Sequence, residues 1–335
     1  MATGSGVAAQ VGMAAETTYG TYVAPTRWIE WESAEPDLKP ERYQGGGLNA
    51  GLLVDRDSRY VEVQRQGTLK LEGDVLARGF GPVLKQIFGT LVGPTQQGAT
   101  AAWLQTHTLS DLGGVMSTQQ IGIPDALPSA TVRPYTCLGC KVTEAEFSCE
   151  AGKQLKLSLT LDVRDIVESQ TLVAATFSAA GEQPFHWGGL AVKAAATAGS
   201  EAAVDGVAGW SLKISRKMKD DRFYANNAGL KSEPLTADRV MITGEIQADY
   251  VDKTLWADRF AANSGFSLVA AFTGDLIATP YSEQITFATP RCRLTGSTPQ
   301  VGGLDVVSGK FPFEVKYDNT NPPITCTYQT IDTTL

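Results

Sequence analysis

The sequence predicts a mainly β protein made of two tandem β-sandwich or barrel domains, each with a short α-helix on its flank. Charged residues make up only 19% of the chain, whereas 34 glycines and 16 prolines are typical of short strands joined by turns. A chain of 335 residues that is 43% hydrophobic exceeds the usual size of one core. Similar blocks also recur in the two halves.

The recurring block is a strand that enters a helix. Residues 67–75 alternate apolar and polar side chains and lead into apolar residues at helical spacing up to position 89. Residues 239–249 show the same alternation and lead into a similar pattern that includes Leu255, Trp256 and Phe260. An aromatic strand and a long loop precede each block, which indicates a duplicated unit.

Two further matches set the alignment of the halves. Gly73 corresponds to Gly244 in the strand that precedes the helix, and Cys140 corresponds to Cys292 in the closing strands. The spacing between matched residues changes along the chain, so the loops differ in length while the order of blocks is kept. A duplicated chain then has two similar domains in series.

We expect four segments along the chain. The Gly- and Ala-rich residues 1–27 form an N-terminal arm, residues 28–168 the first β domain, residues 169–183 a linker, and residues 184–335 the second β domain. Such domains leave strand edges, which polymerise in solution unless they are intended to pair with a neighbour.

Charge and hydropathy exclude several partners. The net charge of −8 and the absence of clustered Lys and Arg argue against capture of nucleic acid, which depends on basic patches. No apolar run has the length of a membrane span, and residues 1–20 lack a secretory signal. We therefore expect synthesis in the cytoplasm and no membrane partner.

No set of residues predicts catalysis, a metal site or a cofactor. The chain has two histidines, His107 and His186, and they lie in opposite halves, which argues against a catalytic triad or a metal cluster built on histidine. Cys137 and Cys140 form a lone CxxC, whereas a structural zinc site needs four ligands. The odd number of cysteines, five, argues against a disulfide framework and favours buried thiols.

Other polar motifs are incomplete. Glu144 and Glu146 alternate along a strand, which places both on one solvated face. Asp55 begins a segment that lacks the glycine and closing glutamate of a calcium loop, and the glycines at 45–47 lack the Lys-Ser/Thr that follows a phosphate-binding loop. A β-sandwich glycoside hydrolase would need two converging carboxylates in a cleft, and no motif indicates them.

Residues 14–26, followed by an aromatic strand, resemble the N-terminal stretch of major tail tube proteins from long-tailed, siphovirus-type bacteriophages of actinobacteria. Residues 185–192, a gap of small residues and then 210–215 are similar to the opening strand, loop and strand of a tail tube domain. The resemblance implies a structural virion protein, not an enzyme, built from domains of the tail tube type.

The resemblance also implies assembly. Tubes of this family contain six domains per ring, so a chain with two domains would form a trimeric ring with pseudo-sixfold symmetry; without the duplication the ring would be a hexamer. The implied partners are other copies, the tape measure protein, the tail terminator and distal tail proteins, and genomic DNA that passes through. The implied location is the virion tail. A terminator or neck ring protein and a bacterial injection-system tube protein are the alternatives.

A DNA conduit predicts a lumen surface that is polar and acidic, because phosphates that are weakly repelled everywhere slide easily. Alternation in the two matched strands provides candidates for this surface. They are Glu72, Asp74, Thr243 and Glu245.

Contacts between stacked rings are expected in segments that order on meeting a neighbour, namely the N-terminal arm and the loops at 43–60 and 224–238. The candidate side chains are Thr17, Tyr19, Tyr43, Asp55, Phe223 and Tyr224.

Overall fold

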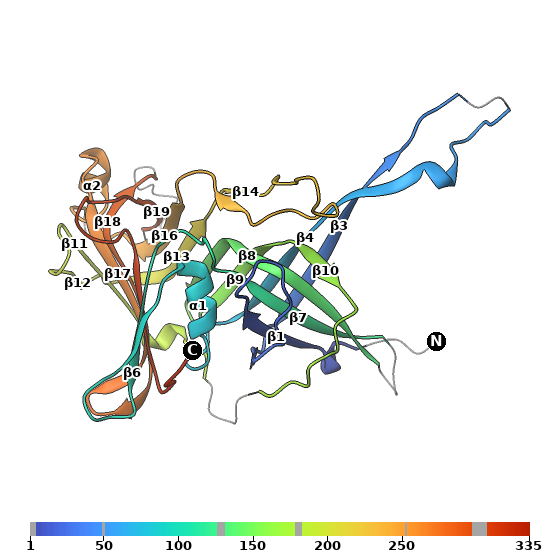
Figure 1. Cartoon of the computed structure of the whole chain (residues 1–335). Helices are drawn as coiled ribbons and strands as arrows, with labels where there is room; N and C mark the ends of the chain where they lie inside the picture. The colour runs from blue at the N-terminus through green and yellow to red at the C-terminus, as the bar shows by residue number, and fades with distance from the viewer. Residues whose placement is uncertain (1–4, 49–50, 126–130, 178–182, 252, 297–306) are drawn as a thin grey trace.

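The computed structural model describes residues 5–48, 51–125, 131–177, 183–251, 253–296 and 307–335, and strands dominate it (Figure 1). The strands are β1 (Gln10–Ala15), β2 (Arg27–Trp28), β3 (Ser33–Gln44), β4 (Tyr60–Asp74), β5 (Val92–Gln96), β6 (Trp103–Thr108), β7 (Ser117–Pro124), β8 (Val132–Glu150), β9 (Lys156–Val163), β10 (Asp165–Val167), β11 (Leu190–Ala195), β12 (Ala202–Ala203), β13 (Val207–Ser215), β14 (Met218–Lys219), β15 (Leu235–Thr236), β16 (Met241–Asp249), β17 (Phe266–Ala278), β18 (Tyr281–Leu294), β19 (Ser308–Val315) and β20 (Thr325–Thr330). The helices are α1 (Gly81–Phe88) and α2 (Ala257–Ala261), with 3-10 turns at Gly6–Ala8, Asp57–Arg59 and Trp187–Gly189. The predicted class, mainly β with short helices, is confirmed.

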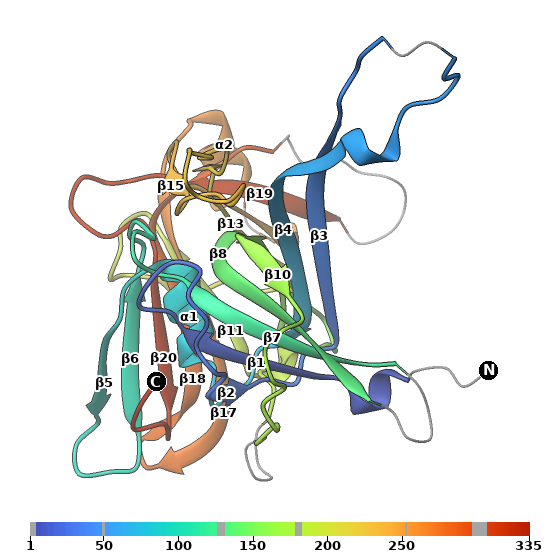
Figure 2. The same ribbon diagram turned by 45° about the vertical axis from the view of Figure 1, so that its right-hand side comes forward.

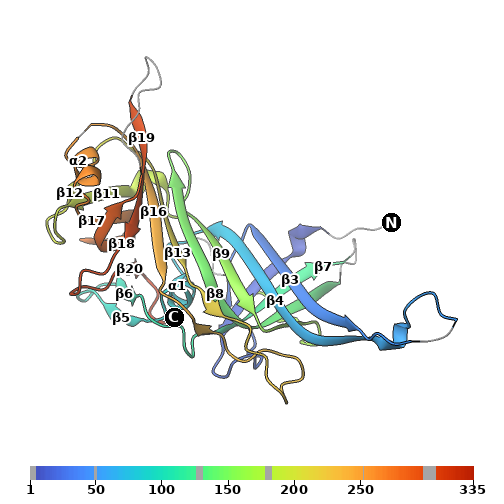
Figure 3. The same cartoon turned by 90° about the horizontal axis from the view of Figure 1, so that it is seen from above.

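One sheet runs through both halves of the chain. Its antiparallel order is β3, β4, β9, β8, β13, β16, β19 and β18, and Figure 3 shows most of these strands side by side. The halves join where β8 pairs with β13, with Glu150 opposite Gly209 at one end and Glu144 opposite Ser215 at the other. The two halves therefore share backbone hydrogen bonds as well as side-chain contacts.

A second layer covers the apolar side of this sheet in the first half. The N-terminal part of β8 bends away to pair with β7 and β10, and β1 pairs with β7. Helix α1 buries Leu84 and Ile87 and ends at Gly89, which adopts a positive φ of 92° as its C-cap. Leu71 and Phe147 from the sheet lie in the same core.

The second half completes its other layer with a hairpin from the first half. Strands β11, β17, β18 and β20 pair in that order, and β6 then adds to β20, with Trp103 opposite Thr330 and Thr108 opposite Thr325. Figure 2 shows β5 and β6 beside β20 and β18. Residues 92–108 thus belong to the first half in sequence and to the second half in the sheet.

The pairing scheme repeats between the halves. The pairs β1–β7, β3–β4, β4–β9 and β8–β9 recur as β11–β17, β13–β16, β16–β19 and β18–β19. In β8–β9 Lys141 lies opposite Asp162, and in β18–β19 Arg293 lies opposite Glu314. Arg293 follows Lys141, and Glu314 follows Asp162, by the same number of residues as Cys292 follows Cys140. The strand register therefore agrees with the expected match of Cys140 with Cys292.

The register does not agree with the expected match of Gly73 and Gly244. Leu161 on β9 lies opposite Leu69, whereas its counterpart Phe313 on β19 lies opposite Gly244, so Leu69 is the structural equivalent of Gly244. The glycine has a steric reason of its own, because a Cβ at residue 244 would stand 2.4 Å from the Phe313 ring. Gly73 and Gly244 are therefore not structurally equivalent residues.

Two expected flexible segments are only partly described. Residues 10–15 of the expected N-terminal arm form β1 within the first half, because Val11 and Met13 are buried in its core. Residues 1–4 of that arm and 178–182 of the expected linker lie outside the described residues. A different segment projects from the body, namely the outer ends of β3 and β4 with residues 45–48 and 51–59, here called the hairpin arm (Figure 1).

Candidate functional surface

The side of the shared sheet that faces away from the core carries continuous rows of polar residues. Directly opposed residues in antiparallel strands point to the same face. One row therefore crosses both halves in the order Ser33, Glu72, Ser158, Glu146, Lys213, Thr243 and Glu314. The next row comprises Asp74, Lys156, Ser148, Ser211 and Glu245. We call these two rows and their neighbours on the same side the polar face.

The structure brings the four candidate lumen residues together on this face. Glu72 and Thr243 share one row, and Asp74 and Glu245 share the next, with β9, β8 and β13 between them. Residues on the opposite side of the same strands are buried and apolar, for example Leu71. Alternation thus separates an apolar core side from one polar surface that spans both halves.

Carboxylates hold two of the lysines of the polar face. Lys156 Nζ lies 2.8 Å from Asp74 and also pairs with Glu32. Lys213 Nζ lies 2.7 Å from Glu144 and 3.8 Å from Glu146, and its hydrogen bond to Glu144 raises the pKa of Lys213. These pairs are partly exposed and add little stability. Their effect is to leave few free cations on a surface rich in carboxylates.

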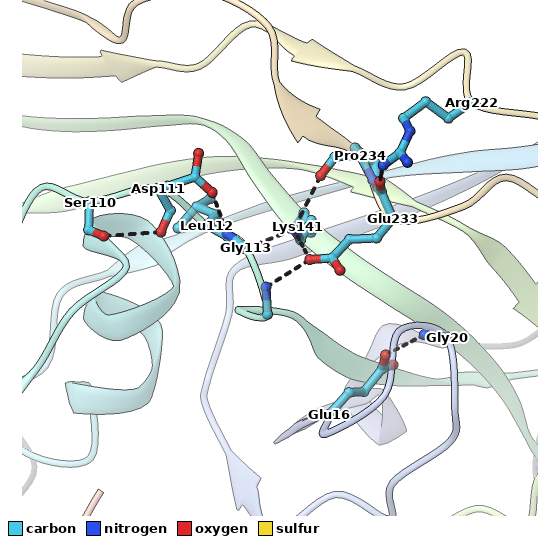
Figure 4. Close-up of polar contacts among 11 residues, drawn as sticks. Glu16, Gly20, Ser110, Asp111, Leu112, Gly113, Lys141, Arg222, Glu233 and Pro234 are labelled. Atoms are coloured by element: carbon cyan, nitrogen blue, oxygen red, sulfur yellow. Dashed lines mark hydrogen bonds and ion pairs between the residues drawn. The ribbon is translucent and has the colours of Figure 1, made fainter.

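A loop of the second half clamps onto the first half at the end of the polar face. Residues 216–240, between β13 and β16, pass over β8 and β9 (Figure 4). The buried Lys141 donates to the carbonyl oxygen of Leu112 at 2.8 Å and to that of Pro234 at 3.3 Å, and it pairs with Glu233 at 2.5 Å. Glu233 also accepts from the Gly114 amide at 2.8 Å.

A second buried ion pair reinforces this clamp. Lys231, fully buried in the loop, pairs with Asp162 on β9. Burial raises the pKa of the Asp162 carboxyl, and the Lys231 ammonium opposes that shift. The Arg65 amide donates to the carbonyl oxygen of Gly229 at 3.0 Å, which ties the loop to β4 as well. The loop supplies the cation of one pair, Lys231, and the anion of the other, Glu233. The strands supply the two opposite charges.

The six candidate contact residues are spread over the surface. Tyr43 on the hairpin arm is 62% exposed and Tyr224 on the clamp loop is 59% exposed. Phe223 is half-buried in the same loop, and Thr17 and Asp55 are exposed. Tyr19 is half-buried instead, because the Arg164 guanidinium lies 5.6 Å from its ring centroid.

Sequence reasoning missed the four charged residues of the clamp. Lys141 follows an apolar stretch at the centre of β8, and Asp162 stands among the apolar residues of β9. A charged residue inside a strand that is otherwise buried is the signal that could have found them, since such a charge needs a partner. The partners themselves, Lys231 and Glu233, lie in a loop without any such pattern.

The described residues contain no group of three or more His, Cys, Asp or Glu placed to hold a metal ion. All five cysteines are buried and unpaired with one another, and burial raises the pKa of Cys149 to about 11 and that of Cys292 to about 12. Cys140 donates through Sγ to the Cys137 carbonyl oxygen at 3.5 Å, a local contact within the strand.

A pocket of about 490 Å³ lies between β1, α1 and the C-terminus. Of its lining residues, Glu16 alone has a carboxylate side chain, and it accepts hydrogen bonds from the Gly20 amide at 2.7 Å, the Gly139 amide at 2.9 Å and the Thr118 hydroxyl at 2.9 Å. Glycoside hydrolysis requires a pair of carboxylates, which this pocket lacks. Glu16 anchors the turn after β1.

No helix in the described part of the chain is long and apolar enough to cross a bilayer. No curated protein matches the sequence. A family model described as phage tail tube protein matches residues 6–315, nearly the whole chain. That family consists of structural components of the virion tail. The chain belongs to the phage tail tube protein family.

Proposed function

We propose that three copies of this chain form a ring with pseudo-sixfold symmetry, and that such rings stack into a hollow tail tube through which genomic DNA passes. The observation that carries the proposal is the pairing of β8 with β13, which makes one sheet of the two halves. Each half contributes four neighbouring strands, so a ring of three chains would close a sheet from six similar units.

The proposal treats the halves as two tail tube domains at residues 28–168 and 184–335. The repeated strand pairs support this division, since each set of pairs forms the same arrangement in the same chain order. The exchanged hairpin β5–β6 crosses the boundary, which ties the domains together within one subunit. A hexameric ring is the alternative if each chain contributes a single unit.

An open strand edge supports ring formation. Among the described residues β3 pairs with β4 alone, whereas its counterpart β13 pairs with both β16 and β8. An exposed edge presents unpaired amides and carbonyls, which a neighbouring chain can satisfy. A neighbour placed at β3 as β8 is placed at β13 would extend the sheet from one copy to the next.

The polar face would line the lumen. Carboxylates hold Lys156 and Lys213 on this face, and exposed acids such as Glu72 add negative charge to it. Phosphate capture requires free cations that release counterions, so DNA would meet weak repulsion and slide. Asp74, Thr243 and Glu245 would lie on the same surface.

Further partners follow from a tail tube. The tape measure protein would occupy the lumen during assembly, and terminator and distal tail proteins would close the tube ends. Contacts between rings would use exposed residues away from the polar face, of which Tyr43 and Tyr224 are the best supported by exposure. A long-tailed phage of actinobacteria as the source is part of the same proposal.

The test is negative-stain electron microscopy of the purified protein across a concentration series. Tubes that lengthen with concentration support the proposal, since a terminator or neck protein would stop at one ring. A compact monomer at every concentration would contradict it.

A further inference from the structure

We propose that Pro36 and Pro40 keep the open edge of β3 from pairing with the same edge of a second copy, so that this edge accepts a different strand of a neighbouring copy. The inference rests on the proposed ring, in which the edge meets the second half of the neighbour. It adds what the edge excludes and the chemistry that excludes it. The surface concerned is the backbone of residues 34–40 on the side away from β4.

The hydrogen bonds of β4 show which way the residues of β3 face. The Arg65 amide donates to the carbonyl oxygen of Gly229 at 3.0 Å, and so it does not bond to β3. Pro40 lies directly opposite Arg65 in the β3–β4 pair. Opposed residues of an antiparallel pair either bond to each other or both face away from each other. The backbone of Pro40 therefore faces the open edge.

Alternation along β3 places a second proline on the same edge. The backbone groups of every second residue share one edge of a strand. The residues that face outward with Pro40 are therefore Ala34, Pro36 and Leu38. Proline has no amide hydrogen, so over these residues the edge offers donors at Ala34 and Leu38 alone, while all four carbonyl oxygens remain.

Strand β13 is the counterpart of β3 in the second half, and β8 fills its edge. Leu212 of β13 lies opposite Gly244, whose structural equivalent is Leu69. Leu69 in turn lies opposite Pro36 of β3. Leu212 and Pro36 are therefore equivalent residues.

The filled edge has an amide where the open edge has a proline. Arg216 stands four residues after Leu212, as Pro40 stands four residues after Pro36. The Arg216 amide donates to the Thr143 carbonyl oxygen of β8 at 2.7 Å. The edge that is paired within the chain keeps its donors, whereas the edge that is left open lacks two of them.

The two prolines weaken self-pairing more than pairing with another strand. In a twofold pairing of two β3 edges centred on Leu38, Pro36 of each copy would stand opposite Pro40 of the other. Neither proline can donate, so this pair of residues forms no hydrogen bond, and the arrangement contains the pair twice. A strand with its own amides would still donate to the carbonyl oxygens of both prolines. A joint between unlike strands thus keeps one hydrogen bond at each proline, where self-pairing keeps none.

Self-pairing at this edge would block the ring. A twofold contact uses the same edge of both copies and closes on itself, whereas a ring needs each edge to meet a different edge of the next copy. The β3 edge is accessible in the single chain, where Leu38 is 38% exposed and Asp37 and Lys39 are exposed. Exposed strand edges pair with one another unless a feature such as proline prevents it. The prolines thus reserve this edge for the ring.

Two substitutions that restore the amides test the proposal in the full chain. We expect the wild type to sediment as a monomer below the concentration at which tubes form. The double variant Pro36→Thr with Pro40→Thr should dimerise there, with a dissociation constant lower by about tenfold or more, because each restored hydrogen bond strengthens the pairing severalfold. Threonine is favoured in strands, so the fold should be kept. Sedimentation equilibrium measures the association of both proteins.

A matched control and a second measurement locate the contact. Pro322→Thr replaces an exposed proline outside the strands and should leave the protein monomeric. Amide hydrogen exchange of the dimer should show new protection at positions 36, 38 and 40. Adding Leu38→Pro to the double variant removes the central donor and should return the protein to the monomer.

The outcomes separate the inference from the proposed function. A folded double variant that stays as monomeric as the wild type would overturn the role of the prolines, and so would a wild type that dimerises through β3. The ring is tested by tube formation of the wild type, and its failure there would leave the dimer test of the prolines valid. If the double variant does not fold, Pro40→Thr alone restores half of the missing donors and should shift the dissociation constant in the same direction; an unchanged value would contradict the proposal.

Discussion

Lys231, in the loop between β13 and β16, is fully buried in an ion pair with Asp162 on β9, 69 residues earlier in the chain. The pair connects the second half to the first at the end of the polar face. A buried ion pair contributes little net stability, because desolvation of both charges offsets their attraction. Its role is to fix the position of the loop, and each charge depends on the other.

The first prediction concerns this pair. Lys231→Met leaves the Asp162 carboxylate buried without its partner and should lower the free energy of unfolding by about 3–5 kcal/mol. The double variant Lys231→Met with Asp162→Leu should lie within about 1 kcal/mol of the wild type. Urea denaturation measures both. If the loss in the double variant equals the sum of the losses in Lys231→Met and Asp162→Leu, the two residues are not coupled. Lys253→Met, at an exposed pair with Asp258, is the control.

Arg216 carries a second prediction. Its guanidinium is buried and donates to the carbonyl oxygens of Ser110 at 2.8 Å and Ile87 at 2.9 Å, and burial lowers the pKa of Arg216 to about 10. Arg216→Met leaves the Ile87 carbonyl at the end of α1 and the Ser110 carbonyl after β6 without this donor, and it should cost about 3 kcal/mol. Amide hydrogen exchange should show faster opening at Gly89, and unchanged protection there would contradict the capping role.

Gly244 gives a steric prediction. A Cβ at this position would stand 2.4 Å from the Phe313 ring and 2.4 Å from the Ser211 carbonyl oxygen, so Gly244→Ala should cost about 1–3 kcal/mol. Adding Phe313→Leu removes part of the clash and should recover some of that loss in thermal unfolding. Gly46→Ala, with no atom within 4 Å of its Cβ, serves as the control. A double variant less stable than Gly244→Ala would argue against the clash.

His107 predicts a pH dependence. Burial lowers its pKa to about 4, and its Nδ1–H donates to the Thr90 carbonyl oxygen at 3.0 Å. Between about pH 6.5 and pH 4 the unfolded chain binds a proton at this residue and the folded chain does not, so stability falls as pH falls. The His107→Gln variant should lose about 3 kcal/mol less than the wild type over this range. Parallel stability curves for the two proteins would refute the assignment.

Alternation in the sequence was enough to place Glu72 with Asp74, and Thr243 with Glu245, on one side of their strands. It could not show that both pairs share a surface, because that depends on the backbone pairing of β8 with β13. The match of Cys140 with Cys292 agrees with the strand register because the two closing strands are separated by the same number of residues in each half. The match of Gly73 with Gly244 was wrong, because residue 244 must be a glycine to leave room for the Phe313 ring.

Two features had no local signal. Strand β6 pairs with β20, more than two hundred residues later, and its Thr and Gln residues show no pattern that selects this partner. The clamp depends on contacts between a loop and strands that are distant in sequence, as Glu233 with Lys141 illustrates. Propensity and periodicity describe single elements, whereas these contacts are decided by packing of the whole chain.

The most direct measurement is a cryo-electron microscopy reconstruction of tubes formed by the purified protein. The proposed ring predicts three chains per ring, six similar units around the axis, and Glu72 and Glu245 on the lumen wall. Six chains per ring, or a polar face on the outside of the tube, would contradict it.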